Sequence, residues 1–201
     1  TYSLTKQADS MAKIINIDSP FAQIMVDDKE IKSNLIGSYN CSNILAAVTI
    51  GKYFDVPIMD IKNAIEEYNP TNNRSQIKKT NKNTLILDCY NANPSSCEKA
   101  IEAFKKIKGE DKRVFIGEMR ELGVVSKEKH KEIADILNNI KLKQVIFVGK
   151  EYEDFANKEN NLWFLTSNEA KEYLKKENIK DSLILIKGSR LTQMENLIDV
   201  L

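Results

Sequence analysis

Several residue patterns that would mark common protein classes are missing from this 201-residue sequence. It has a single histidine, His130, and only three cysteines, Cys41, Cys89 and Cys97. These residues predict neither a Cys/His zinc site of usual spacing nor an even disulfide framework, so we expect reduced thiols. A Ser-His-Asp or Cys-His catalytic set would depend wholly on His130, which makes such chemistry a poor expectation.

The seven glycines form no recognisable phosphate-binding loop. Gly51-Lys52 leads into a tyrosine and Gly149-Lys150 into a glutamate, where G-x-x-x-x-G-K-[ST] needs serine or threonine. The pattern G-x-G-x-x-G is absent as well. If the protein handles ATP, we expect its main phosphate-binding residues to lie outside this chain.

Neither a strong net charge nor a long apolar run is present. The net charge is +1, which gives no reason to expect a nucleic acid or an anionic membrane as partner. The longest apolar runs, such as 44–50, are too short to span a bilayer, and the first ten residues do not resemble a signal peptide. Apolar residues at 42% and charged residues at 29% are typical of a globular protein, which we expect in the cytoplasm.

A polar segment at 68–83 divides the chain and is expected to be a linker or hinge, because it holds five asparagines and a proline. Residues 1–70 contain 6 Lys and Arg against 9 Asp and Glu (−3), whereas 71–201 contain 24 against 20 (+4). We therefore expect two domains, 1–70 and 71–201.

Residues 1–70 predict three short strands followed by two helices. The predicted strands span 12–17, 21–26 and 30–36, and the predicted helices span 41–54 and 59–68. Residues 27–30, Asp-Asp-Lys-Glu, are expected to form a hairpin turn, and the second helix is expected to begin after Pro57 or at a cap provided by Asp60. So few elements make a poor closed domain, which indicates part of something larger.

Residues 71–201 alternate between apolar strands and helices. The strands are predicted at 84–90, 113–119, 144–150, 162–166 and 182–188. The helices are predicted to begin near Pro94, Ser126, Glu151, Ser167 and Leu191. This alternation predicts an α/β fold whose sheet is largely parallel and covered on both faces.

Polar residues gather at four predicted strand ends, in segments 88–93, 117–123, 149–150 and 187–190. Because ligands of parallel sheets bind beyond the carboxyl ends of the strands, this edge is the expected site. Each segment also has a structural explanation. Asn91 and Asn93 can form Asx turns and cap the next helix. Glu118 and Glu121 can be solvated loop acids, and His130 is expected to pack at a helix start.

Five motifs resemble those of the Mur ligases, in the order in which that family carries them. They are LIGSYNCSNILAA (35–47), NRSQ (73–76), DCYNANPSS (88–96), GEMRELG (117–123) and KGSRLTQME (187–195). The resemblance is greatest to members that add D-alanyl-D-alanine to UDP-N-acetylmuramoyl-tripeptide, because sister ligases carry other residues at 90–93. The sequence departs from the family pattern at Tyr39, Asn73, Cys89 and Glu118. Asn73 replaces a glycine, a tolerable change because asparagine visits left-handed backbone conformations.

The resemblance implies an ATP-dependent amide ligase of peptidoglycan synthesis, with a UDP-substrate domain, a central ATPase domain and a Rossmann-like C-terminal domain. Residues 1–70 would be the tail of the central domain and 71–201 the C-terminal domain. The phosphate loop and the Mg²⁺ ligands would lie upstream, in the missing N-terminal domains. We expect a fragment that is inactive alone, from a monomeric, cytoplasmic bacterial enzyme without nucleic-acid or membrane partners. The start at Thr1, with the first methionine at Met11, fits this expectation.

The resemblance also implies site residues. Those expected to bind ATP are Asn40, Asn43, Arg74 and Asp88. Those expected to bind the peptide substrates are Tyr90, Asn91, Asn93, Glu121, Lys187 and Ser189. In the family's reaction the tripeptide carboxylate becomes an acyl phosphate, which the amine of D-alanyl-D-alanine attacks. Lys187 and Ser189 would receive the dipeptide's carboxylate, and Arg74→Ala or Asp88→Ala should lower turnover of the full enzyme without loss of the fold.

Two other functions remain open from the residues. One is another ligase of the superfamily, of the folylpolyglutamate synthase type, which would use ATP in the same way on another substrate. The other is a non-catalytic nucleotide- or peptide-binding α/β module. A purely structural protein is the poorest fit, because it would not gather polar residues on one edge of a sheet.

Overall fold

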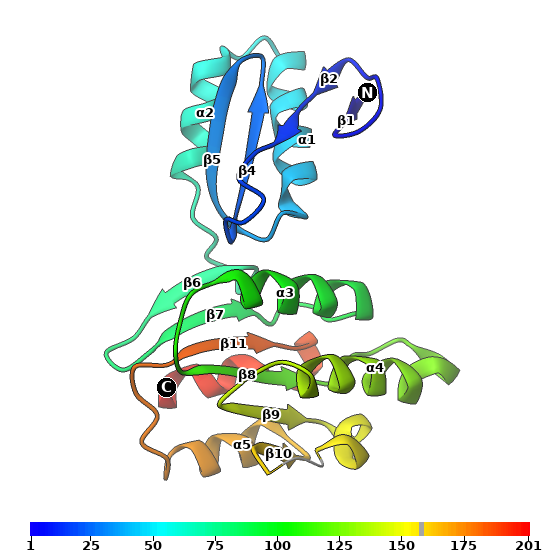
Figure 1. The fold of residues 1–201 in the computed structure, drawn as a ribbon, viewed down its shortest axis with the longest axis vertical. Helices are drawn as coiled ribbons and strands as arrows, with labels where there is room; N and C mark the ends of the chain where they lie inside the picture. Colours follow the sequence, from blue (N-terminus) through cyan, green and yellow to red (C-terminus); the bar gives the residue numbers. More distant parts are fainter. Residues whose placement is uncertain (157–158) are drawn as a thin grey trace. The chain divides into compact units, whose positions relative to one another are not determined.

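The computed structural model describes residues 1–156 and 159–201, and contacts between residues divide the chain into two compact units (Figure 1). The first comprises Thr1–Pro70 and Glu102–Ile107, and the second comprises Thr71–Ile101 and Lys108–Leu201. We call them the N-terminal unit and the C-terminal unit.

The N-terminal unit combines a three-stranded antiparallel sheet with two helices. Its strands are β3 (Lys13–Ile14), β4 (Phe21–Val26) and β5 (Lys29–Ile36), its helices are α1 (Asn40–Tyr53) and α2 (Ile58–Glu67), and two short strands, β1 (Tyr2–Ser3) and β2 (Ser10–Met11), form a separate parallel pair. Asp27 and Asp28 have left-handed φ values of 45° and 58° and form the predicted turn between β4 and β5. Helix α2 begins after Pro57 without a side-chain cap, so Asp60 is not its cap.

Alternating residues of β4 build the core of the N-terminal unit. Ala22, Ile24 and Val26 are buried, as expected for a strand with one covered face. They belong to one apolar cluster with residues of both helices, among them Ile44 and Ile61. The strand predicted at 12–17 is shorter in the structure than the sequence suggested.

The C-terminal unit contains a six-stranded sheet in the order β10–β9–β8–β11–β7–β6. The strands are β6 (Gln76–Lys79), β7 (Thr84–Asp88), β8 (Lys112–Gly117), β9 (Gln144–Val148), β10 (Asn161–Phe164) and β11 (Leu183–Lys187). All neighbouring pairs are parallel except β6 with β7. The predicted α/β fold with a largely parallel sheet is confirmed.

Strand β6 corrects the prediction that 68–83 is a linker throughout. Ile77 of β6 lies opposite Ile86 in an antiparallel ladder with β7. The strand is at the edge of the sheet and mostly exposed, so its sequence shows no buried apolar run. Lysines at its end, Lys78 and Lys79, are typical of an exposed edge strand.

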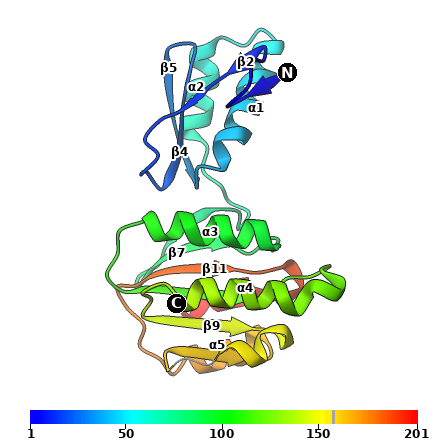
Figure 2. The ribbon, with the colours of Figure 1, turned by 45° about the vertical axis from the view of Figure 1, so that its right-hand side comes forward.

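Helices cover both faces of the sheet, as Figures 1 and 2 show. Helix α3 (Pro94–Lys106), whose residues up to Ile101 belong to this unit, and α4 (Ser126–Asn138) lie on one face. Helix α5 (Ser167–Leu174) and the 3-10 helix η4 (Met194–Val200) lie on the other. Leu85 and Leu87 of β7 share an apolar cluster with Leu174 and Leu197 of the second layer.

Three of the connections after strands are short 3-10 helices. They are η1 (Gly123–Val125), η2 (Lys150–Phe155) and η3 (Arg190–Thr192). The helices predicted near Glu151 and Leu191 therefore exist as 3-10 rather than α-helical turns. Within the described residues, every helix is too short or too polar to cross a membrane.

Candidate functional site

A buried ion pair lies at the carboxyl edge of the C-terminal sheet. Lys187 ends β11, and its Cα partner on β7 is Asp88. The Lys187 ammonium donates to Asp88 Oδ2 at 2.8 Å and to the carbonyl oxygen of Asn91 at 3.0 Å. The Lys187 side chain is 1% exposed and that of Asp88 18% exposed. Because a buried ammonium needs acceptors, this pair holds the loop after β7 against β11.

Beside this pair, Tyr90 lies near two guanidinium groups. The Arg74 Cζ atom is 3.7 Å from the centre of the Tyr90 ring, and the Arg190 Cζ atom is 5.7 Å from it. Both distances are within the range in which a cation is attracted to a ring face. Both arginine side chains are exposed, so their charges can reach an anionic ligand at this edge.

The backbone on either side of Arg74 is fixed to the sheet. The amide of Cys89 donates to the carbonyl of Asn73 at 3.0 Å, and the amide of Ser75 donates to Asp88 Oδ1 at 3.3 Å. Asn73 has a φ of 56°, which confirms that asparagine takes the left-handed conformation here. Arg74 is therefore part of the C-terminal unit.

Asn93 caps helix α3, as its structural explanation predicted. Its Oδ1 accepts from the Ser96 amide at 2.9 Å, and Ser96 Oγ accepts from the Asn93 amide at 3.1 Å. This reciprocal arrangement is a capping box, with Pro94 at the first helical position. Asn91 is exposed, and its Oδ1 accepts from the Ala92 amide at 2.8 Å. Among the residues described by the structure, the side-chain NH₂ groups of both asparagines are the parts left for a ligand.

Ser189 follows β11 and is 3% exposed. Among the residues that the structure describes, its hydroxyl has no hydrogen-bond partner. A buried hydroxyl without a partner is unfavourable, so a ligand that bonded to it would recover that free energy.

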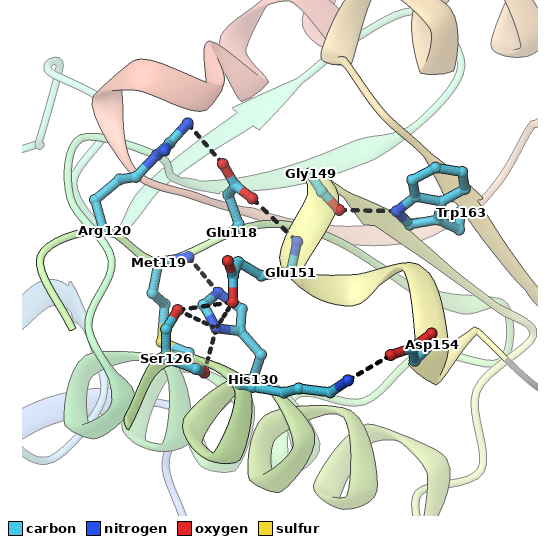
Figure 3. A network of polar contacts seen from close by, with 10 residues as sticks. Glu118, Met119, Arg120, Ser126, His130, Gly149, Glu151, Asp154 and Trp163 are labelled. Carbon is cyan, nitrogen blue, oxygen red and sulfur yellow. Dashed lines mark hydrogen bonds and ion pairs between the residues drawn. The ribbon is translucent and has the colours of Figure 1, made fainter. Parts of the chain in front are cut away.

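The loop after β8 begins beside the end of β9, where the Glu118 amide donates to the Val148 carbonyl at 2.8 Å, and Figure 3 shows Glu118 between Arg120 and Glu151. Glu118 is buried, pairs with Arg120 at 2.6 Å and accepts from the Glu151 amide at 3.3 Å. Gly149 has a φ of 114°, and a Cβ there would lie 2.6 Å from the Glu118 carboxyl group, so only glycine fits. Glu118 is therefore not a solvated loop acid, whereas Glu121 is exposed.

Two buried cysteines, Cys89 and Cys97, lie near this edge of the sheet. Burial raises the pKa of the Cys89 thiol to about 12 and that of Cys97 to about 11. Both thiols therefore stay protonated and unreactive at neutral pH. Within the described residues, no three His, Cys, Asp or Glu side chains gather as metal ligands.

The N-terminal unit carries Asn40 and Asn43 at the start of α1. Asn40 is buried, and its Nδ2 donates to the Ile36 carbonyl at 2.8 Å. Asn43 Nδ2 donates to Asn40 Oδ1 at 2.9 Å. Asn43 also borders a pocket of about 300 Å³ with mainly apolar walls, which is lined by Leu35, Asn43, Ile44, Ala47, Ala64, Ile65 and Tyr68.

Residues 73–190 match the family model described as Mur ligase, glutamate ligase domain. The chain belongs to the Mur ligase family. It is 28% identical over 175 residues to the UDP-N-acetylmuramoyl-tripeptide--D-alanyl-D-alanine ligase of Bacillus subtilis (strain 168), covering 82% of this chain and 38% of the relative. The enzyme of that name from Buchnera aphidicola subsp. Baizongia pistaciae is 34% identical over 173 residues, covering 83% and 37%. This Mur ligase chain thus spans less than two fifths of these relatives.

Solved structures with the same fold include two described as MurF. Crystal structure II of MurF from Acinetobacter baumannii has a TM-score of 0.85 at 24% identity and covers 98% of this chain and 46% of that one. MurF from Thermotoga maritima in complex with ADP has a TM-score of 0.76 at 24% identity, with 97% and 46% covered. At these identities the likeness shows the fold of the Mur ligase chain.

Five of the ten expected site residues lie together at the carboxyl edge of the C-terminal sheet. These are Arg74, Asp88, Tyr90, Asn91 and Lys187. Ser189 comes just after β11, and the side-chain oxygen of Asn93 is used in capping α3. Glu121 is on the loop after β8. Asn40 and Asn43 belong to the N-terminal unit. Sequence reasoning gave no role to Arg190, although the KGSR motif contains it; no spacing rule indicates that its guanidinium lies near Tyr90.

Proposed function

We propose that this Mur ligase chain is the C-terminal part of an ATP-dependent ligase that adds D-alanyl-D-alanine to UDP-N-acetylmuramoyl-tripeptide. Residues 1–70 would be the tail of its central ATPase domain and 71–201 its C-terminal domain. The observation that carries the proposal is the carboxyl edge of the C-terminal sheet, where the buried Lys187–Asp88 pair lies beside the exposed Arg74. Relatives of this name at 28% and 34% identity support the choice of substrates.

The chain's own groups suit a reaction between a carboxylate and an amine. Lys187 is almost wholly buried and already bonded to Asp88 and Asn91, so its part is to position this loop. The carboxylate of the incoming dipeptide is bound by the unpaired Ser189 hydroxyl and the adjacent Arg190 guanidinium, which can bind a carboxylate through two parallel hydrogen bonds. Such a reaction needs alignment and charge stabilisation more than an elaborate acid–base set.

The residues present fit the nucleotide in part. The pocket beside Asn43 has the apolar walls and the single amide that a purine ring requires, and Asn40 holds that amide in place. In the C-terminal unit, Arg74 carries an exposed positive charge of the kind that binds a phosphate group. When bound, ATP supplies the phosphoryl group that activates the tripeptide carboxylate as an acyl phosphate. The residues that bind Mg²⁺ are expected upstream of Thr1. The reaction is expected to take place in the bacterial cytoplasm.

The test is product formation by the full-length enzyme. Phosphate release should require ATP, the UDP-linked tripeptide and D-alanyl-D-alanine together, with L-alanyl-L-alanine and D-glutamate inactive as the amine. A response to glutamate with a folate substrate would instead assign the chain to the folylpolyglutamate synthase type. ATP or peptide binding with no turnover under any of these conditions would favour the non-catalytic module.

Two serines that flank β11 offer a matched pair of variants. Ser189 is just beyond the carboxyl end of the strand, and Ser182 is a buried serine just before its other end, where its hydroxyl donates to the Lys180 carbonyl at 3.1 Å. Ser189→Ala should raise the KM for D-alanyl-D-alanine about tenfold, the effect of one lost hydrogen bond, and leave the KM for ATP unchanged. Ser182→Ala should change neither. Equal effects of both variants would remove Ser189 from the dipeptide site.

A further inference from the structure

Three segments of the C-terminal unit are joined by hydrogen bonds (Figure 3). They are the first residues of the loop after β8, the start of α4 and the start of η2. The Ser126 hydroxyl of α4 donates to Glu151 Oε2 at 2.9 Å, and the Glu151 amide donates to Glu118 at 3.3 Å. Glu118 is thereby tied through η2 to the start of α4.

His130 holds the next residue of the same loop. The Met119 amide donates to His130 Nε2 at 2.8 Å, and His130 is fully buried. On the other side of the ring, His130 Nδ1 is 2.7 Å from the Ser126 carbonyl oxygen, which can only accept. Nδ1 must therefore carry the proton and Nε2 must be the acceptor, so this neutral tautomer is fixed by the structure.

Glu118 and Met119 are the last anchored residues before the exposed part of the loop. Arg120 and Glu121 follow directly and have exposed side chains. Glu121 has a φ of 64°, a left-handed conformation that is uncommon for glutamate and is kept only where neighbouring structure imposes it. The direction in which Arg120 and Glu121 leave the sheet edge thus depends on the two anchors.

We propose that His130 is a positioning residue of the ligase reaction, which acts by holding the Met119 amide and so fixing how the loop presents Glu121 to the amine substrate. The proposal rests on the proposed function, because it takes the ammonium group of an incoming dipeptide as the partner of the Glu121 carboxylate. A carboxylate on an exposed but fixed loop attracts and orients such a group without a change in its own position. His130 itself does not touch the substrate.

The hydrogen bond from the Met119 amide to His130 Nε2 forms only while the histidine ring is neutral. If Nε2 gains a proton, it becomes a donor that faces the Met119 N–H, and the hydrogen bond is lost. The charged and titratable groups around the ring are Glu118 and Arg120 of the loop and Glu151 and Tyr152 of η2. The two glutamates favour a charged ring, whereas burial and Arg120 oppose it; burial is the largest effect and lowers the pKa of His130.

The kinetic test uses two variants of the full-length enzyme. His130→Phe keeps a ring but has no acceptor, and His130→Gln keeps an amide oxygen that can accept from Met119 and does not titrate. His130→Phe should raise the KM for D-alanyl-D-alanine about tenfold, as expected for a lost hydrogen bond, with little change in the KM for ATP. Because protonation of Nε2 would break the bond to Met119, the KM of the wild type should rise in acid. His130→Gln should restore the KM and abolish that rise. A folded His130→Phe enzyme with the wild-type KM would overturn the proposal.

A control separates positioning from stability. Leu137 is buried on the same helix, two turns further on. Leu137→Ala should destabilise the protein by a cavity effect and leave the KM for the dipeptide unchanged. If Leu137→Ala raised this KM as much as His130→Phe does, His130 would have only a structural role.

A second measurement does not depend on ligase activity. In this 201-residue chain, exchange of the Met119 amide hydrogen, followed by NMR, should be at least tenfold faster in His130→Phe than in the wild type, with His130→Gln in between. Unchanged exchange in His130→Phe would disprove the coupling between His130 and the loop. If the full-length wild type has no ligase activity, the proposed function fails, and the exchange experiment still decides whether His130 controls this loop.

Discussion

The buried Lys187–Asp88 pair allows a stability prediction that can be worked out from its contacts. The Lys187 side chain is 1% exposed, and Asp88→Ala would remove its paired carboxylate and leave the Asn91 carbonyl as its acceptor among the described residues. Breaking a buried pair from one side costs about 3–5 kcal/mol in the free energy of unfolding. Since small domains are stable by about 5–15 kcal/mol, this is a large fraction of the total.

Two further variants of the pair identify the cause of that loss. Asp88→Asn keeps an acceptor for Lys187 and should cost about 1–2 kcal/mol, because the charge-assisted bond becomes a neutral one. The double variant Asp88→Leu with Lys187→Met removes both charges, and its cost should be at least 2 kcal/mol smaller than that of Asp88→Ala, because no unpaired charge stays buried.

Urea unfolding followed by tryptophan fluorescence measures these differences in the free energy of unfolding for the C-terminal unit. Trp163, the single tryptophan, is in β10 and donates to the Gly149 carbonyl at 2.8 Å, so its emission reports the C-terminal unit. A loss below 1 kcal/mol for Asp88→Ala would refute the reasoning, since it would mean that water reaches the ammonium. The same argument makes Asp88→Asn, rather than Asp88→Ala, the variant suited to a turnover assay.

Three other predictions concern the same unit. Gly149→Ala should cost about 2–4 kcal/mol through strain and contact with Glu118, whereas Gly123→Ala, with a φ of 56° and no described neighbour within 4 Å, should cost about 1 kcal/mol; urea midpoints compare them. Asn93→Ala should cost about 1 kcal/mol of helix-capping energy and Asn93→Asp almost none, measured likewise. Burial lowers the pKa of His130 below 6.5, so the unfolded state binds its proton first as the pH falls. Stability should therefore decline below about pH 6.5 and level off once the pH passes the folded-state pKa, and His130→Gln should remove this part of a pH series of unfolding curves.

The parallel part of the fold could be predicted because its strands are buried on both faces. Each of β7, β8, β9 and β11 is a continuous apolar run, and such runs are visible in a single sequence. Strand β6 could not be predicted in the same way, since an exposed edge strand has little apolar content. The sequence predicts helices after β9 and β11 but does not distinguish α from 3-10 geometry, because short turns with a few apolar residues share the helical spacing.

The candidate site was predictable in location but not in its internal contacts. The rule that parallel strands end at one edge correctly brought Asp88 and Lys187 together. The burial of Glu118 was missed, because it depends on η2 turning back over the loop, a long-range contact. The expected packing of His130 is what the structure shows, but its bond to Met119 leaves no trace in the spacing of the sequence.

The anchored backbone around Arg74 has a consequence for the thermodynamics of ligand capture. If an arginine lay on a disordered segment, binding an anion would order that segment. The backbone entropy lost would then cost about 1–2 kcal/mol for each residue ordered. Because Asn73 and Ser75 are already bonded to the loop after β7, Arg74 has only its own side-chain rotamers to lose. The ordering of this segment is completed when the chain folds, so an anion bound at Arg74 under the proposed function would meet a group that is already in place.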